Sequence, residues 1–283
     1  MADHALSGAP ALLPLYAKAA ATAPLHRGDT LPDSSYTLAD QAIDPAHLVA
    51  YQRVCGFGVS DVLPPTYLHV LAFPLSVALM TEQAFPFPLV GLVHVANSIT
   101  VTRPVRSAAR MSFRVHAANL RPHAAGRQLD LLAEATVDGE LVWSAVSTYL
   151  RRGKPPAGTA KKERQNPTPA PPAGAVAQVR APGDIGRRYG DVSGDRNPIH
   201  LHKLSARLFG FPSAIAHGMW LKARTLAALQ GRLPDAYTAD VAFKLPVLLP
   251  ATVLIGAEQK ADGWSLDVRS RSGKPHLTGA VTF

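Results

Sequence analysis

The same order of predicted elements occurs twice along the chain, and this internal repeat restricts the fold more than any other feature. In the first half, an apolar helical segment at 66–80 precedes four runs with strand-like composition, at 89–102, 109–119, 128–137 and 141–151. In the second half, the helical segment and its runs lie at 218–229, 238–245, 251–259, 264–270 and 275–283. Turn-forming pairs such as Asp138-Gly139 and Asp262-Gly263 separate the runs. The pattern predicts two copies of one helix-plus-antiparallel-sheet unit.

The two copies also agree in detail. Pro104-Val105, after the first run of one half, corresponds to Pro246-Val247 in the other, and we call the separation between these two pairs the repeat offset. Met111 and Val253, in the strands that follow, are separated by the same repeat offset. We therefore expect an α+β fold in which each sheet wraps around its helix and buries the helix's apolar face.

A proline-rich bridge separates the two halves. Residues 151–180 contain almost no large apolar side chains, and their prolines are Pro155, Pro156, Pro167, Pro169, Pro171 and Pro172. Such a stretch cannot bury enough surface to offset its ordering entropy, so we expect a linker that is extended or mobile. The predicted division is an N-terminal domain at 1–150, the linker at 151–180 and a C-terminal domain at 181–283.

The composition excludes several classes of protein. A single cysteine, Cys55, rules out an internal disulfide framework and a multi-cysteine metal site, and it points to a reducing compartment. The longest apolar stretch, Leu68 to Met80, is short and contains Pro74, so it predicts a buried helix and no membrane span. Asp3 stands where a signal peptide would carry basic residues. We expect a cytoplasmic protein.

The charge balance leaves two interpretations open. The chain has 29 Lys and Arg against 20 Asp and Glu, a net charge of +9. The excess fits attraction of an acidic partner, such as the phosphates of coenzyme A or an acidic carrier protein, and it fits equally a basic surface with a basic linker. Nucleic acid is disfavoured because the basic residues are scattered. The sequence contains no glycine-rich phosphate-binding loop, and we expect no cofactor.

One segment carries candidate chemistry. Residues 189–200 read Tyr-Gly-Asp-Val-Ser-Gly-Asp-Arg-Asn-Pro-Ile-His and place a carboxylate, Asp195, five residues before an imidazole, His200. The turn-forming residues predict a loop, which Pro198 stiffens. Such a loop can hold both groups facing one small volume, which suits a reaction in which one group takes a proton while another gives one. His202 invites a metal interpretation, but no further ligand lies at suitable spacing, so we expect no metal.

A second motif follows at 215–220, Ile-Ala-His-Gly-Met-Trp, and leads into the apolar helix of the second half. Gly218 stands where that helix is predicted to begin. Free N–H groups and the positive end of the helix dipole stabilise a developing oxyanion, and glycine lets a carbonyl group approach the backbone. His217 is interpreted as packing or as scaffolding for the helix start.

Together these residues resemble a known family. Gly-Asp-Arg-Asn-Pro-Ile-His at 194–200, Ala-His-Gly-Met at 216–219 and Phe-Lys-Leu-Pro-Val at 243–247 look like the MaoC-like dehydratases, which include the R-specific enoyl-CoA hydratases called hydratase 2. The N-terminal half, with Leu63-Pro64-Pro65-Thr66-Tyr67 and the run from Phe85 to His94, resembles the first half of double-hot-dog members such as bacterial 3-hydroxyacyl-thioester dehydratases.

The resemblance implies a double hot dog with one active site, built from the C-terminal copy, because the N-terminal copy lacks the Asp-x-Asn-Pro-x-His string. The family's catalytic pair falls on Asp195 and His200, its dyad-supporting position on Asn197 and its oxyanion donor on Gly218. Some relatives carry a serine two turns into the helix, where this chain has Leu226 beside Thr225. This departure puts the hydrogen bonding around the dyad in question.

The implied reaction is the reversible hydration of trans-2-enoyl thioesters to (3R)-3-hydroxyacyl thioesters in fatty-acyl metabolism, with coenzyme A or an acyl carrier protein as the thioester handle. The degenerate N-terminal copy would accommodate the acyl chain. A homodimer is compatible with the sequence. Two alternatives are an acyl thioesterase on a hot-dog scaffold and an acyl-thioester binding protein without activity. The dyad argues against both.

Overall fold

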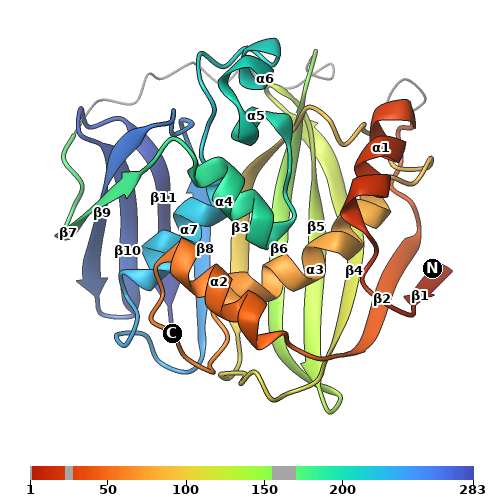
Figure 1. Ribbon diagram of the computed structural model, residues 1–283, viewed down its shortest axis with the longest axis horizontal. Helices are drawn as coiled ribbons and strands as arrows, with labels where there is room; N and C mark the ends of the chain where they lie inside the picture. The colour runs from red at the N-terminus through yellow and green to blue at the C-terminus, as the bar shows by residue number, and fades with distance from the viewer. Residues whose placement is uncertain (1, 23–27, 155–169) are drawn as a thin grey trace.

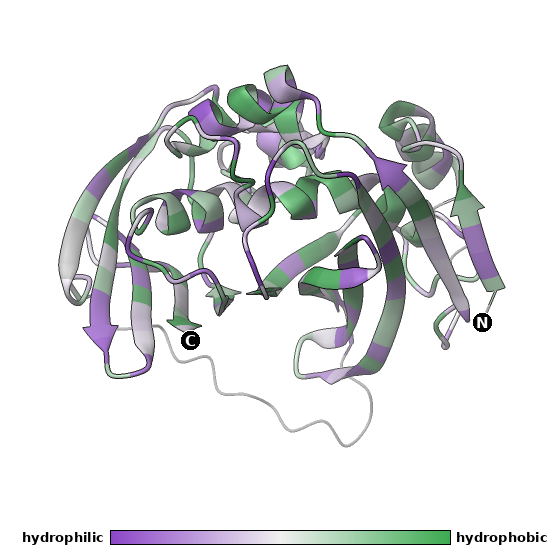
Figure 2. Ribbon diagram, turned by 90° about the horizontal axis from the view of Figure 1, so that it is seen from below, coloured by the Kyte–Doolittle hydropathy of each residue, from purple (hydrophilic) through white to green (hydrophobic). Residues whose placement is uncertain are grey.

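The computed structural model describes residues 2–22, 28–154 and 170–283, and its strands form one continuous sheet (Figure 1). The eleven strands follow the order β1-β2-β4-β5-β6-β3-β8-β11-β10-β9-β7. All neighbours are antiparallel except β1 and β2, which are parallel. The two predicted sheets are therefore joined edge to edge, and the sheet curves around the central helices (Figure 2).

The N-terminal half supplies β1 (Ala2–Leu6), α1 (Leu12–Thr22), β2 (Ser34–Gln41), α2 (Pro45–Cys55), α3 (Pro65–Met80), β3 (Leu92–Val101), β4 (Met111–His123), β5 (Gly126–Val137) and β6 (Glu140–Arg152). The C-terminal half supplies β7 (Ala175–Ala181), α4 (Ile185–Ser193), α5 (Pro198–Leu201), α6 (Lys203–Leu208), α7 (Gly218–Ala227), β8 (Tyr237–Phe243), β9 (Ala251–Lys260), β10 (Gly263–Ser270) and β11 (Pro275–Thr282). The two helices and eight strands predicted from the repeat are confirmed within a few residues.

The bridge between the halves is shorter than predicted at its C-terminal end. Residues 175–181 form β7, which pairs with β9 at the edge of the sheet. This short strand of alanine, valine and polar residues has no apolar run of its own, so its pairing partner decides its conformation. Residues 155–169 lie outside the described residues.

An approximate two-fold axis relates the two halves where β3 meets β8. Asn97 pairs with Val241, and Ile99 pairs with Ala239. The repeat offset relates Asn97 to Ala239 and Ile99 to Val241, so it converts each of these pairs into the other. It relates Ser98 to its own pairing partner, Asp240. The axis therefore passes between Ser98 and Asp240, and the fold is the predicted double hot dog.

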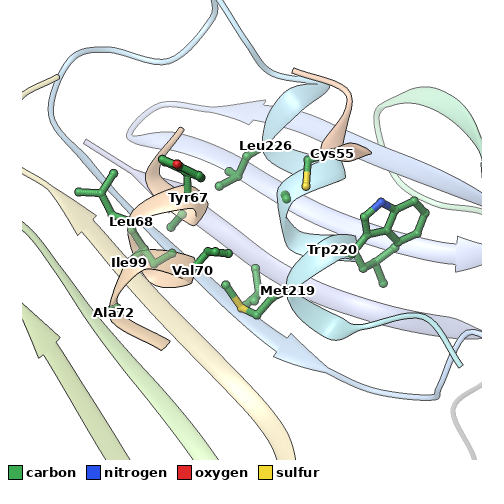
Figure 3. Close-up of a cluster of buried hydrophobic side chains, with 14 of the residues drawn as sticks. Cys55, Tyr67, Leu68, Val70, Ala72, Ile99, Met219, Trp220 and Leu226 are labelled. Atoms are coloured by element: carbon green, nitrogen blue, oxygen red, sulfur yellow. The ribbon is translucent and has the colours of Figure 1, made fainter. Parts of the chain in front are cut away.

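The two central helices form the core between the arms of the sheet. Helix α3 is apolar around its whole circumference, and most of its residues are buried, as expected for a helix wrapped by a sheet. Side chains of α3 and α7, including Val70 and Met219, fill the space between the two helices (Figure 3). Pro65 at the first position of α3 has a φ that suits a helix start. Within the described ranges, no helix is long and apolar enough to cross a membrane.

A buried lysine connects α7 to both strands of the junction. Lys222 is fully buried, and its Nζ donates hydrogen bonds to the backbone oxygen of Asn97 (3.0 Å) and the side-chain oxygen of Asn97 (2.6 Å) on β3, and to the backbone oxygen of Ala239 (2.8 Å) on β8. Burial holds the pKa of this amine well below its usual value. Lys222 thus fixes α7 against the strands that lie on the two-fold axis.

Replacing this lysine tests its contribution to the junction. We expect Lys222→Met to lower the free energy of unfolding by about 3 kcal/mol, because three buried oxygens lose their donors. Lys260→Met, at an exposed lysine, is the control and should change it by less than about 0.5 kcal/mol. Denaturant unfolding measures both. A Lys222→Met protein as stable as the control would contradict this interpretation.

Candidate active site

The segment predicted as a loop is instead two helices joined at their caps. Helix α4 ends at Ser193, and Gly194 caps it in the left-handed region at φ 72°. Helix α5 begins at Pro198, and the Asn197 side chain accepts a hydrogen bond from the N–H of Ile199. Glycine, asparagine and proline are as typical of helix caps as of turns, which explains the incorrect loop prediction. Asp195 lies between the two helices.

The structure brings Asp195 and His200 together and adds a third residue, His217. A ligand atom from each of the three side chains lies within 4.8 Å of the other two. Asp195 comes from the α4–α5 connection, His200 from α5, and His217 immediately precedes α7. The Asp195 side chain is 32% exposed and that of His217 is 3% exposed. The carboxylate is thus reachable from solvent beside two buried imidazoles.

The orientation of His200 leaves one ring nitrogen free for chemistry. Its Nδ1 lies 2.8 Å from the backbone oxygen of Ile215, which only accepts, so Nδ1 carries the hydrogen. In the neutral ring the lone pair is then on Nε2. Burial lowers the pKa of His200, against the opposing effects of the Asp195 charge and the Ile215 contact. His200 is therefore a neutral base near pH 7.

His217 fixes the geometry of both predicted catalytic residues. Its ring stacks on that of His200 with 3.6 Å between centroids, and its Nε2 donates to the backbone oxygen of Asp195 at 2.9 Å. Burial and then the neighbouring His200 hold the pKa of His217 well below its usual value. The sequence motif placed it beside Gly218, but nothing in that motif indicated its contact with Asp195.

Asn197 reaches the dyad through its backbone. Its N–H donates to Oδ1 of Asp195 (3.2 Å), while its side chain caps α5. The two contacts hold the carboxylate at a fixed distance from the helix that carries His200. This geometry is compatible with the supporting role that the family resemblance implies for Asn197.

Gly218 is the first residue of α7, as predicted. An added Cβ would lie 3.0 Å from the ring of Phe243 in β8, so a larger residue would displace that ring. The N–H groups of a first helical turn lack partners within the helix and point away from it. A carbonyl oxygen placed there would meet a donor and the positive end of the helix dipole.

The departure at Leu226 and Thr225 leaves the dyad's hydrogen bonds intact. The hydroxyl of Thr225 donates to the backbone oxygen of Leu221 in its own helix, and Leu226 is buried in the apolar core. The hydrogen bonds around the dyad come instead from Asn197, His217 and Ile215. A serine in α7 is therefore not needed to orient these groups.

The orientation of the histidines bears on metal binding. A cation needs converging lone pairs, but Nε2 of His217 carries the hydrogen that it donates to Asp195, and Nδ1 of His200 is likewise occupied. In the neutral rings the remaining lone pairs are on Nε2 of His200 and on Nδ1 of His217, which is buried without a hydrogen-bond partner among the described residues. The nitrogen that faces Asp195 from His217 is thus occupied by its hydrogen, whereas Nε2 of His200 can accept a proton.

The N-terminal half contributes a buried wall of aromatic and imidazole rings near this pair. His94 stacks on Tyr149 at 4.6 Å, and it meets the edge of Phe243, the ring beside Gly218, at 5.2 Å. His69 lies 6.1 Å from His94. Burial and then Lys222 lower the pKa of His69 to about 4, and burial with the Asp195 charge raises that of Tyr149. His69 and Tyr149 therefore lie within the electrostatic reach of Asp195.

Comparison with known proteins identifies the class that this fold and site define. A family model of the MaoC-like domain matches residues 164–280. Over 269 residues, the chain is 39% identical to the 3-hydroxyacyl-thioester dehydratase X of Mycobacterium tuberculosis, covering 94% of this chain and 95% of that protein. The chain belongs to the MaoC-like dehydratase family.

Solved structures agree with this assignment. The crystal structure of HtdX from Mycobacterium tuberculosis matches with a TM-score of 0.77 and 39% identity, over 87% of this chain and 98% of that one. A conserved hypothetical protein of the same organism, described as having a double hot-dog fold, matches with a TM-score of 0.56 and 12% identity over 87% and 96% of the two chains. The second match supports the fold alone.

The lowered pKa of His69 predicts a pH-dependent stability. Between pH 6.5 and about 4 the unfolded chain binds a proton at this position and the folded chain does not, so the free energy of unfolding falls as the pH falls through this window. The full loss from His69 is about 3 kcal/mol. We expect His69→Gln to flatten the dependence by that amount in denaturant titrations. His202→Asn, at an exposed histidine that caps α6, should leave it unchanged. Equal slopes in wild type and His69→Gln would contradict the prediction.

Proposed function

We propose that this protein catalyses the reversible hydration of trans-2-enoyl thioesters to (3R)-3-hydroxyacyl thioesters, with Asp195 and His200 as its acid–base pair. The observation that carries the proposal is the convergence of the Asp195 carboxylate with the imidazole of His200, whose Nε2 is the free nitrogen. The relative that matches almost the whole chain is named a 3-hydroxyacyl-thioester dehydratase. This name describes the reverse of the proposed hydration.

The two acceptors suit a single water molecule. A carboxylate and a neutral imidazole nitrogen each accept one hydrogen bond, so one water can donate to both and direct a lone pair at C3 of the enoyl group. As the C3–O bond forms, one member of the pair takes a proton, and a proton is delivered to C2 as the double bond is lost. The reverse sequence removes water from the hydroxyacyl thioester, and no proton is gained or lost overall.

The start of α7 completes the proposed site. Negative charge collects on the thioester oxygen as C3 is attacked, and the Gly218 N–H with the helix dipole stabilises it there. Loss of one such donor costs about 3 kcal/mol of transition-state stabilisation in other enzymes. Asn197 and His217 would act as positioning residues, because they contact the dyad and not the reacting atoms.

The two halves would have different functions. In this proposal the C-terminal domain, 181–283, carries the dyad and the oxyanion donor, residues 151–180 connect the halves, and the N-terminal domain, 1–150, accommodates the acyl chain against the ring wall of His69, His94 and Tyr149. The substrate is a thioester of coenzyme A or of an acyl carrier protein, for which the net charge of +9 offers attraction. A cytoplasmic location and a homodimer complete the proposal.

Substitution of the pair tests the reaction directly. Asp195→Asn and His200→Ala should each lower kcat for crotonyl-CoA and octenoyl-CoA by about a thousandfold or more, because each removes a group that can exchange a proton with the attacking water. Loss of enoyl absorbance measures the rate, and chiral analysis of the product tests the (3R) assignment. Near-wild-type hydration by either variant would refute the assignment of the pair.

The control variant makes the same Asp-to-Asn change at a carboxylate outside the site. Asp191 lies in α4, four residues before Asp195, and forms an exposed ion pair with Arg196. Asp191→Asn should therefore retain wild-type activity. Release of free thiol from acyl-CoA, measured in the same reactions, separates hydration from the thioesterase alternative. Ligand binding without either signal would favour the binding protein.

The pH profile tests the protonation state of His200. Hydration needs the lone pair on Nε2, so activity should fall as His200 becomes protonated. Since burial lowers this pKa, the acidic limb of log kcat/KM should lie below pH 6.5. A limb centred at or above pH 7 would contradict the proposed neutral base.

A further inference from the structure

A cavity of about 200 Å³ opens at the seam between the two halves, and neither Asp195 nor His200 is among its lining residues. Its wall combines the start of α3, the end of β3 and the region after α7, with Leu68, Val101, Trp143, Leu226, Leu233 and Tyr237 among its lining residues. Arg103 and Asp235 add charged groups to this apolar lining. We call this space the seam cavity.

The seam cavity is the two-fold counterpart of the candidate active site. Helices α2 and α4 both end at a left-handed glycine, Gly56 at φ 73° and Gly194 at φ 72°. Val62 and Ile215 each form an isolated bridge shortly before α3 and α7, and their bridge partners, Arg106 and Leu248, are related by the repeat offset.

This correspondence locates the counterpart of each catalytic group. Phe57 follows Gly56 as Asp195 follows Gly194, and Pro65 begins α3 as Gly218 begins α7. Both Phe57 and Pro65 line the seam cavity. Val101 lines it too, at the position that the repeat offset relates to Phe243.

The residues at these corresponding positions lack the catalytic groups, but the cavity between them is retained. A phenyl ring stands in place of the carboxylate. Proline has no N–H, so the first residue of α3 cannot donate to an oxyanion. The connection from Gly56 to Val62 also contains only residues 57–61, whereas α5 and α6 with His200 lie between Gly194 and Ile215. In the described part of the chain, no equivalent pair of helices covers the seam cavity.

We propose that the seam cavity is a second, non-catalytic site that binds a linear acyl chain with an anionic head group. The choice of ligand rests on the proposed function, since the cavity is the counterpart of a site assigned to acyl thioesters. Its volume exceeds that of an apolar cavity of about 150 Å³ that holds benzene. The Arg103 guanidinium, which is partly exposed and forms an ion pair with Glu140 (2.9 Å), is the cation among the lining residues that would face the head group.

Binding stoichiometry tests the proposal on the full chain. Octanoyl-CoA has no double bond to hydrate, so calorimetric titration measures binding alone. We expect wild type to bind two equivalents and Val101→Phe to bind one, because this change places in the cavity the ring found at the corresponding position of the catalytic half. If Val101→Phe fails to fold, Leu233→Trp, at another partly buried lining residue, should have the same effect. Val59→Phe, at an exposed residue that does not line the cavity, should still bind two.

The head group is tested separately. Arg103→Glu should weaken binding of the second equivalent at least tenfold, and a titration with octanoate distinguishes a free fatty acid from the coenzyme A thioester as the source of the chain. The proposal would be overturned if wild type bound one equivalent of each ligand, or if Val101→Phe and Leu233→Trp both still bound two equivalents. Two equivalents in a protein that hydrates no enoyl thioester would uphold the second site while rejecting the proposed reaction.

Discussion

The antiparallel pairing of β3 with β8 is the contact on which the rest of the structure depends. It joins two sheets into one, and its register places Ser98 opposite Asp240 on the two-fold axis. Lys222 hydrogen-bonds to both strands and so fixes α7 relative to them. The first turn of α7 then lies beside Phe243, and the His94 ring of the N-terminal half reaches the same place.

The two halves retain one scaffold and differ in what it carries. Glycine caps and strand bridges are preserved because backbone geometry requires them, whereas the side chains that follow them have diverged. In the C-terminal half an insertion of two short helices brings His200 to Asp195. In the N-terminal half, Pro65 and Phe57 leave an apolar space without a proton donor or acceptor at the corresponding positions. Sequence divergence has thus turned a symmetric scaffold into an asymmetric protein.

Burial sets the electrostatics of the dyad. His200 and His217 stack at 3.6 Å, a contact that two protonated rings would oppose by repulsion, and desolvation keeps the pKa of each below its usual value. Their hydrogen bonds to backbone oxygens determine which nitrogen carries the hydrogen. The same low-dielectric surroundings strengthen any interaction between the dyad and a substrate.

The sequence by itself determined the repeat, the two central helices and eight strands, and it singled out Asp195, His200, Asn197 and Gly218 as candidate site residues, because periodicity, caps and motifs are local properties of the chain. Only the tertiary structure decided the edge pairing of β7, the contact of His217 with Asp195, the position of Lys222 and the seam cavity. These depend on residues far apart in sequence, whose proximity is fixed by sheet register and by packing across the two-fold axis. No local pattern carries that information.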